Sequence, residues 1–164
     1  MAITIISLHK DNKVFKDMEV VKKFDFQSIL VSNHTDVIEN LTDKMIYRLI
    51  ILRERLYDIT AAIKELFGVD TVCSSGGRTK KVNKLVGGSS SSQHPDFKAL
   101  DLNFYINGVR TRDKDTIEMI FAFLSGFLDG MWIQMFKYSW GIHIGFVDSE
   151  RLTIDKRKGN LWKH

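Results

Sequence analysis

The longest hydrophobic pattern in the chain runs between residues 38 and 66. Its apolar positions recur at steps of three and four, which places their side chains on one face of an α-helix. These positions are Ile38, Leu41, Met45, Leu49, Leu52, Leu56, Ile59, Ile63 and Leu66. The pattern predicts an amphipathic helix of about eight turns, with Thr35 or Asn40 as its N-terminal cap and Gly68 just beyond its C-terminal end.

Shorter patterns lie on both sides of this helix. Residues 2–7 and 12–32, ahead of it, fit short strands and turns. After it, residues 69–75, "VDTVCSS", fit a strand, and residues 79–86, "TKKVNKLV", fit a short helix closed by two glycines.

The segment 98–106, "KALDLNFYI", alternates as a half-buried strand does. Its apolar side carries Leu100, Leu102 and Phe104, and its polar side carries Asp101 and Asn103. We therefore expect the two polar side chains to lie on the face of the sheet opposite the core.

The remaining elements are a turn at 107–109, a second and more apolar helix over 113–131, and two strands at 132–139 and 141–147. The two strands are expected to pair antiparallel, joined near Trp140 and Gly141. This order of elements predicts an α+β fold with helices beside a mostly antiparallel sheet.

Length and composition fit one globular domain spanning residues 1–164. The chain has 164 residues, of which 44% are hydrophobic and 27% charged, as in ordinary soluble domains. No apolar run approaches the length of a transmembrane helix, so we expect no membrane insertion. The first residues, "MAITIISLHKDN", carry no basic region and no cleavage site of a secretory signal. We expect synthesis in the cytoplasm.

The formal charge of +4 is mildly basic and favours approach to an anionic polymer. The sequence has no dense basic stripe interleaved with aromatic residues, so we do not expect nucleic acid as a partner. Cys73 is the single cysteine, which excludes an internal disulfide. Its apolar surroundings predict a buried, inert thiol.

Three residues carry candidate metal chemistry. Asp101 stands between two leucines, where a carboxylate is costly unless a lysine, an arginine or a metal ion pairs with it. His143 lies in the apolar strand "GIHIGF", and His94 ends the serine-rich loop. Two histidines and one carboxylate form a common three-ligand zinc set with an open fourth position. The alternatives are a hydrogen-bonded core histidine, a salt-bridged aspartate and a flexible serine loop.

The segment from Ser75 onward resembles the zinc D-alanyl-D-alanine carboxypeptidases, or LAS metallopeptidases, which include phage endolysins. The matching motifs are Ser75-Gly76-Gly77-Arg78, then Asn83 with Gly87-Gly88, then Ser92-Gln93-His94, then Ala99-Leu100-Asp101, and finally "WGIHIGF". They occur in the family's order within a motif region of residues 72–147, and several linked motifs are more specific than one.

The resemblance implies a Hedgehog/DD-peptidase-like fold and a zinc site formed by His94, Asp101 and His143. It also implies that Arg78 and Ser92 contact the substrate. A fixed arginine can hold a peptide carboxylate or stabilise the oxyanion of amide hydrolysis, which makes Arg78 a candidate catalytic residue.

The sequence departs from the family's pattern at the general base. Many members carry an acidic residue three positions before the last histidine, where this chain has Trp140, or an Asp two positions after it, where it has Gly145. In phage-type members an acidic residue often precedes a Gln that Gln134 matches, but here that residue is Ile133. The nearest other carboxylates are Asp148 and Glu150, with Asp96 more remote. The base is therefore unassigned.

Two functions follow from the resemblance. The first is a zinc metallopeptidase that cleaves peptidoglycan stem peptides, as a D-Ala-D-Ala carboxypeptidase or an L-Ala-D-Glu endopeptidase, in a phage or its bacterial host. It would act at the cell wall or in a phage particle. The alternative is a catalytically silent family member that serves as a virion or partner-binding protein. The sequence predicts no oligomeric state.

Overall fold

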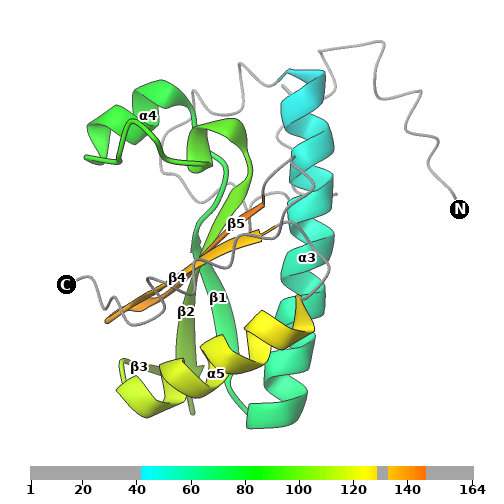
Figure 1. Cartoon of the computed structure of the whole chain (residues 1–164), viewed down its shortest axis with the longest axis vertical. Coiled ribbons are helices and arrows are strands. Elements are labelled where there is room, and N and C mark those ends of the chain that lie inside the picture. The colour runs from blue at the N-terminus through cyan, green and yellow to red at the C-terminus, as the bar shows by residue number, and fades with distance from the viewer. Residues whose placement is uncertain (1–41, 129–132, 147–164) are drawn as a thin grey trace, which may run out of the picture.

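The computed structural model describes residues 42–128 and 133–146 (Figure 1). Within these residues the chain forms three α-helices, one 3-10 turn and five strands. The elements, in chain order, are α3 (Asp43–Phe67), β1 (Asp70–Ser75), α4 (Lys80–Leu85), η4 (His94–Asp96), β2 (Ala99–Ile106), β3 (Val109–Thr111), α5 (Lys114–Phe127), β4 (Ile133–Tyr138) and β5 (Gly141–Phe146). The predicted α+β class with an antiparallel sheet is confirmed.

The predicted long helix is α3, but it begins later than expected. Its N-terminal cap is Thr42, whose hydroxyl accepts a hydrogen bond from the Met45 N–H at 3.3 Å. A cap at Thr35 or Asn40 was therefore wrong, since Thr42 supplies the oxygen that the first turn needs. The helix ends as predicted at Gly68, whose φ of 67° is left-handed.

The core-facing side of α3 is nearly as predicted. Leu49, Leu52, Leu56, Ile59 and Ile63 are fully or almost fully buried. Leu66, by contrast, is exposed. Its neighbour Phe67 packs instead, edge-on against Phe123 of α5 at 5.4 Å between ring centroids.

The sheet has the order β1-β2-β5-β4, and β3 pairs with the C-terminal end of β2. Every pairing is antiparallel. The short strand β3 was not predicted. It follows the predicted turn at Asn107 and Gly108, whose φ angles of 51° and 77° are those of a tight hairpin. Strands β4 and β5 pair as expected, joined at Trp140 and Gly141.

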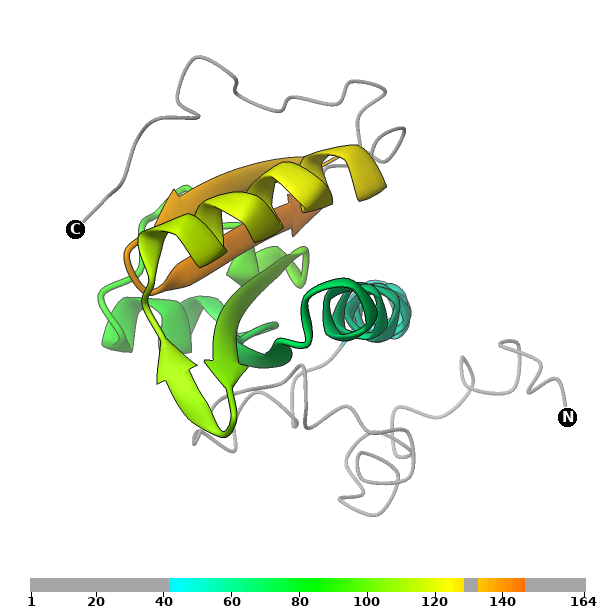
Figure 2. The same cartoon turned by 90° about the horizontal axis from the view of Figure 1, so that it is seen from below.

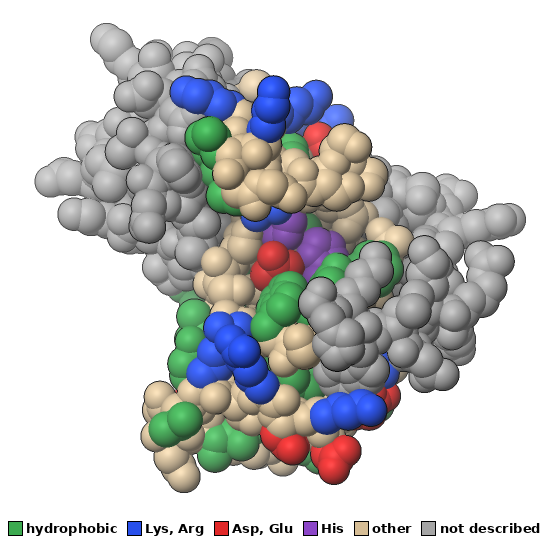
Figure 3. All heavy atoms as spheres, turned by 90° about the vertical axis from the view of Figure 1, so that its left-hand side faces the viewer, with side chains coloured by type: hydrophobic (Ala, Val, Ile, Leu, Met, Phe, Trp, Pro, Cys, Tyr) green, Lys and Arg blue, Asp and Glu red, His purple; other side chains and the backbone are tan. Residues whose placement is uncertain are grey.

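Helices α3 and α5 pack on one face of the sheet (Figures 1 and 2). Strand alternation sends Leu100, Leu102 and Phe104 of β2 into this core, and they are completely buried. Ile142 and Ile144 of β5 do the same. The opposite face of the sheet is therefore left to the polar residues that alternate with them (Figure 3).

The thiol of Cys73 is free and buried, as predicted. Burial, with a smaller contribution from the charge of Asp101, raises the pKa of Cys73 to about 12. Among the described residues, no helix has both the length and the apolar character that crossing a bilayer requires. The strands and turns predicted at 2–7 and 12–32 lie outside the described residues, as do Asp148 and Glu150.

Candidate metal site

Asp101 and His143 lie directly opposite each other on the paired strands β2 and β5. Both side chains point to the face that the helices leave open, because their neighbours along each strand point into the core. His143 Nδ1 is 2.7 Å from Asp101 Oδ1. The sheet register thus brings together two residues that are 42 positions apart in the sequence.

His94 reaches the same carboxylate from the turn η4. Its Nε2 is 3.1 Å from Asp101 Oδ2, and its imidazole is almost fully buried. The ring packs edge-on against that of His143, with 5.1 Å between centroids. Behind it, Phe97 anchors the turn: its side chain is completely buried and packs so close to Gly77 that a β-carbon there would collide with the ring.

The arrangement of nitrogen atoms fits a metal ion. Each imidazole turns one nitrogen toward Asp101 and the other toward a carbonyl oxygen: His94 Nδ1 lies 2.7 Å from Gly76 O, and His143 Nε2 lies 3.4 Å from Gln93 Oε1. In each ring we call the nitrogen that faces Asp101 the inner one and the nitrogen that faces the carbonyl the outer one. A neutral imidazole carries a single N–H, so a ring whose outer nitrogen keeps that proton has its inner nitrogen available as a metal ligand in place of the hydrogen bond to Asp101. The potential ligand atoms of His94, Asp101 and His143 all lie within 4.8 Å of one another. Ligands of a tetrahedral zinc ion lie roughly 3.3 Å apart.

The environment of Asp101 keeps it ionised. Burial by itself would raise the pKa of this carboxyl, but the hydrogen bonds and charges of His143 and His94 outweigh it and hold the pKa well below its ordinary value. The site therefore presents a carboxylate, which is the form that binds metal.

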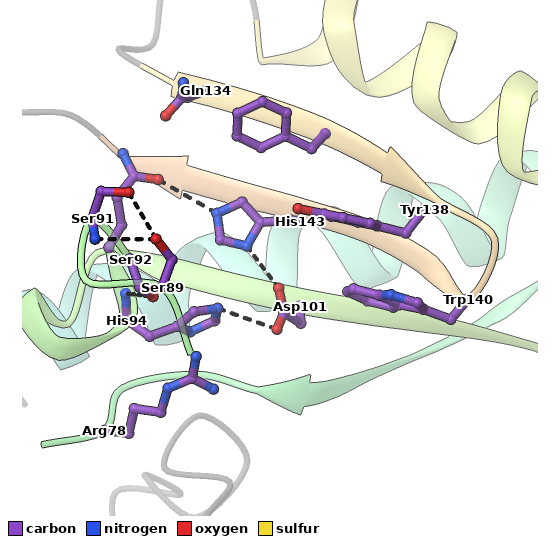
Figure 4. Close-up of a pocket in the computed structure, with 12 residues that line it drawn as sticks. Arg78, Ser89, Ser91, Ser92, His94, Asp101, Gln134, Tyr138, Trp140 and His143 are labelled. Carbon is purple, nitrogen blue, oxygen red and sulfur yellow. Dashed lines mark hydrogen bonds and ion pairs between the residues drawn. The ribbon is translucent and has the colours of Figure 1, made fainter. Parts of the chain in front are cut away.

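Arg78 enters the site from the loop after β1 (Figure 4). Three hydrogen bonds hold it in place. Its Nε donates to Asn83 Oδ1 at 3.0 Å, its Nη1 donates to Ser75 Oγ at 2.9 Å, and its backbone N–H donates to the His94 carbonyl at 3.2 Å. Burial lowers the pKa of Arg78 despite the nearby charge of Asp101, but an arginine remains charged.

The serine-rich loop is ordered by hydrogen bonds rather than free. Asn83 Nδ2 donates to the Ser89 carbonyl at 2.9 Å, and Gly88 packs so closely on Asn83 that a β-carbon would collide with its amide. Ser92 Oγ accepts a hydrogen bond from the His94 N–H at 3.3 Å, which leaves its hydroxyl proton available to a ligand.

The three candidate ligands, Arg78 and Ser92 line one pocket of about 520 Å³. Its far wall comes from the outward face of β4, where Gln134, Phe136 and Tyr138 alternate with the buried Ile133 and Met135. Of the residues in this wall, only Gln134 was singled out from the sequence, by its position in the family motif. The alternation of buried and outward positions over residues 133–138 could also have indicated Phe136 and Tyr138.

Tyr138 and Trp140 stack at the edge of the pocket, with 4.7 Å between ring centroids and 9° between planes, and Tyr138 points toward His143 (Figure 4). Arg110 holds the turn that carries Trp140, because its Nη2 donates to Asn103 Oδ1 at 2.7 Å and to the Trp140 carbonyl at 3.1 Å. Trp140, at the position where many family members carry an acidic residue, is thus part of a fixed aromatic surface.

Asp101 is the only carboxylate among the described residues that line this pocket. Asp96 is exposed and lines a separate pocket. The described structure therefore does not bring Asp96 to the site.

A family model described as Peptidase M15 matches residues 17–119, which is more than half of the chain. The match contains Arg78, Ser92, His94 and Asp101 and ends before His143. No curated protein and no solved structure gives a significant match. M15 peptidases are zinc-dependent, and the three side chains at the bottom of the pocket are suitable metal ligands. The chain belongs to the Peptidase M15 family.

Proposed function

We propose that this protein is a zinc-dependent peptidase that cleaves peptidoglycan stem peptides, with His94, Asp101 and His143 as the metal ligands. The observation that carries the proposal is the convergence of three donor groups, from η4, β2 and β5, at the bottom of an open pocket. Membership of the Peptidase M15 family supports the hydrolase class.

The ligand atoms follow from the hydrogen bonds around them. His94 would bind through Nε2 and His143 through Nδ1, since the other nitrogen of each ring faces a carbonyl oxygen. Asp101 would supply a carboxylate oxygen. Bound zinc supplies Lewis acidity, which activates a water molecule and polarises the scissile carbonyl.

Arg78 and Ser92 would orient the substrate. The Arg78 guanidinium is fixed by Asn83 and Ser75, and its remaining nitrogen, Nη2, makes no hydrogen bond to the described residues. It can therefore hold a substrate carboxylate or the developing oxyanion without losing an existing contact. The Ser92 hydroxyl can donate a hydrogen bond to the substrate while its oxygen still accepts one from the His94 N–H.

We further propose that the scissile bond is of the D-Ala-D-Ala or L-Ala-D-Glu type, and that the protein acts at a bacterial wall or in a phage particle. The pocket fits a peptide with a carboxylate near the cleaved amide, because Arg78 is its fixed cation and Tyr138 and Trp140 offer a flat apolar surface. One domain over residues 1–164 remains part of this proposal.

The second candidate is a family member that binds zinc without catalysis. It is favoured by the lining of the pocket, in which Asp101 is the only carboxylate that the described residues contribute. If Asp101 is a ligand, it is not free to act as a general base. A carboxylate base would then have to come from outside the described residues that line the pocket.

The test combines metal analysis with digestion of purified peptidoglycan and identification of the products by mass. We expect one zinc per chain and release of stem-peptide fragments, both lost in His143→Ala and both kept in Glu65→Gln, an exposed control on α3. Zinc binding without any product would support the silent member. A parent protein that binds no zinc, or a His143→Ala variant as active as the parent, would overturn the peptidase proposal.

A further inference from the structure

The amide of Gln93 fills the space between the outer nitrogen of His143 and the backbone of Gly145. Its Oε1 lies 3.4 Å from His143 Nε2. A β-carbon on Gly145 would overlap the same oxygen, so the amide occupies the place where a side chain at position 145 would begin. Gln93 also lines the pocket.

The position of Gly145 explains why this space is open. Residues 143 and 145 are two apart on β5, so they face the same side of the sheet. The strand is paired on both edges there, with Ala99 of β2 and Gln134 of β4 opposite Gly145. Because the backbone at this point is fixed by both neighbours, the absent side chain is what admits the Gln93 amide.

The two histidines of the site are held in matching ways. The outer nitrogen of His94 faces the backbone carbonyl of Gly76 at 2.7 Å. The outer nitrogen of His143 faces a side-chain carbonyl, that of Gln93. Hydrogen bonds of this kind fix the ring orientation and the tautomer of a metal-binding histidine and raise its affinity for the ion.

The backbone of Gln93 is itself fixed. Its carbonyl accepts hydrogen bonds from the N–H groups of Asp96 and Lys98, both at 3.2 Å, and it immediately precedes His94. One short segment therefore supplies a ligand candidate and the partner of a second one.

We propose that Gln93 is a positioning residue for His143, and that Gly145 is the residue that gives it access. By accepting a hydrogen bond from the Nε2–H group, Gln93 keeps the ring proton on Nε2 and leaves Nδ1 as the nitrogen that faces Asp101 and the metal. This inference rests on the proposed metal site, and it adds two residues that act on the metal only through His143.

The experiment measures zinc affinity of the full-length chain by competition with a chromophoric chelator. Gln93→Ala is expected to weaken zinc binding about 10- to 100-fold. Gly145→Ala is expected to do the same, since its methyl group would take the place that the Gln93 amide occupies. Gln93→Glu keeps an oxygen acceptor of the same reach, so we expect it to bind zinc about as tightly as the parent.

The double variant Gln93→Ala/Gly145→Ala separates this mechanism from general damage. It is expected to bind zinc about as well as Gln93→Ala alone, because no amide is left to displace. Gly126→Ala is the matched control: Gly126 lies on the exposed side of α5 with no atom within 4 Å of the new β-carbon. Its zinc affinity should equal that of the parent.

A direct readout comes from nitrogen-15 spectra of the histidines in the zinc-loaded protein. We expect His143 with its proton on Nε2 in the parent and in Gln93→Glu. A Gln93→Ala variant that binds zinc as tightly as the parent would overturn the inference while leaving the metal site intact. Losses that multiply in the double variant would overturn the role of Gly145. A parent that binds no zinc would instead refute the proposed function, and this inference with it.

Discussion

Lys137 and Glu118 form a two-point ion pair that joins β4 to α5, with Lys137 Nζ 2.6 Å from each carboxylate oxygen. The lysine side chain is almost completely buried on the core side of β4, whereas half of the Glu118 side chain is exposed. Phe136 and Tyr138, the neighbours of Lys137 in β4, point to the opposite side of the sheet and line the pocket. The ion pair thus supports one wall of the site from behind.

Removing the acidic partner should destabilise the protein because a buried ammonium group loses a two-point ion pair. We expect Glu118→Ala to lower the free energy of unfolding by about 1–3 kcal/mol, with the exposure of Glu118 keeping the loss below that of a fully buried pair. Urea denaturation followed by circular dichroism measures this. Glu65→Ala, at an exposed position of the other helix, is the control, and equal stability of the two variants would contradict the role of the pair.

Zinc should stabilise the folded protein through the three proposed ligands. At a free zinc concentration of about 100 times the dissociation constant, binding to the folded state alone adds about 2.7 kcal/mol. We expect a rise in the unfolding temperature on zinc addition, its reversal by a chelator, and no rise in Asp101→Ala. Thermal scans at matched zinc concentrations test this, and a zinc-dependent rise of equal size in Asp101→Ala would argue against Asp101 as a ligand.

Arg78 should matter for turnover rather than for metal binding. Its guanidinium is held as a fork by Asn83 and Ser75, a geometry that lysine cannot reproduce. In an active peptidase we expect both Arg78→Ala and Arg78→Lys to lower kcat/KM by about 100- to 1,000-fold. Zinc affinity should stay near that of the parent. Full activity of Arg78→Lys would show that a point charge suffices and that the fixed fork has no role.

Cys73 should resist thiol reagents as long as the protein is folded. Alkylation requires the thiolate, and a pKa of about 12 leaves almost none at neutral or mildly alkaline pH. We expect iodoacetamide to label the native protein slowly and the urea-unfolded protein rapidly, with mass spectrometry as the readout. Rapid labelling of the folded protein would contradict the burial of this thiol.

The same pKa shift predicts a pH dependence of stability with a definite sign. The thiol loses its proton near its ordinary pKa only in the unfolded chain, so the unfolded state binds fewer protons than the folded state between that pKa and about 12. Stability should therefore fall as the pH rises above the ordinary thiol range. The share of this loss of stability that comes from Cys73 should be absent in Cys73→Ser. Denaturation of the parent and the variant at about pH 7 and about pH 10 tests this.

Periodicity predicted most of the described elements because each is decided by local pattern. Alternation at residues 98–106 is sufficient to place Asp101 on the face opposite the core. The helix start was missed because the apolar period continues upstream of residue 42, while the cap depends on a single hydroxyl. The three-residue β3 escaped because it is too short to show a period.

The site was predictable only in part. Motif order indicated His94, Asp101 and His143, and the structure does bring these three side chains together. The role of Gln93 could not be read from the sequence, because its contact with His143 depends on a missing side chain at Gly145 and on the sheet register. Tyr138 and Trp140 likewise meet only through the β4–β5 turn.

The most direct test of the proposed metal site is X-ray absorption spectroscopy of the purified protein loaded with one equivalent of zinc. We expect a four-coordinate zinc with two imidazole nitrogens at about 2.0–2.1 Å and light oxygen ligands. One imidazole should be lost in His94→Ala and one in His143→Ala. A sulfur ligand at about 2.3 Å, or a spectrum that neither substitution changes, would contradict a zinc ion held by these side chains.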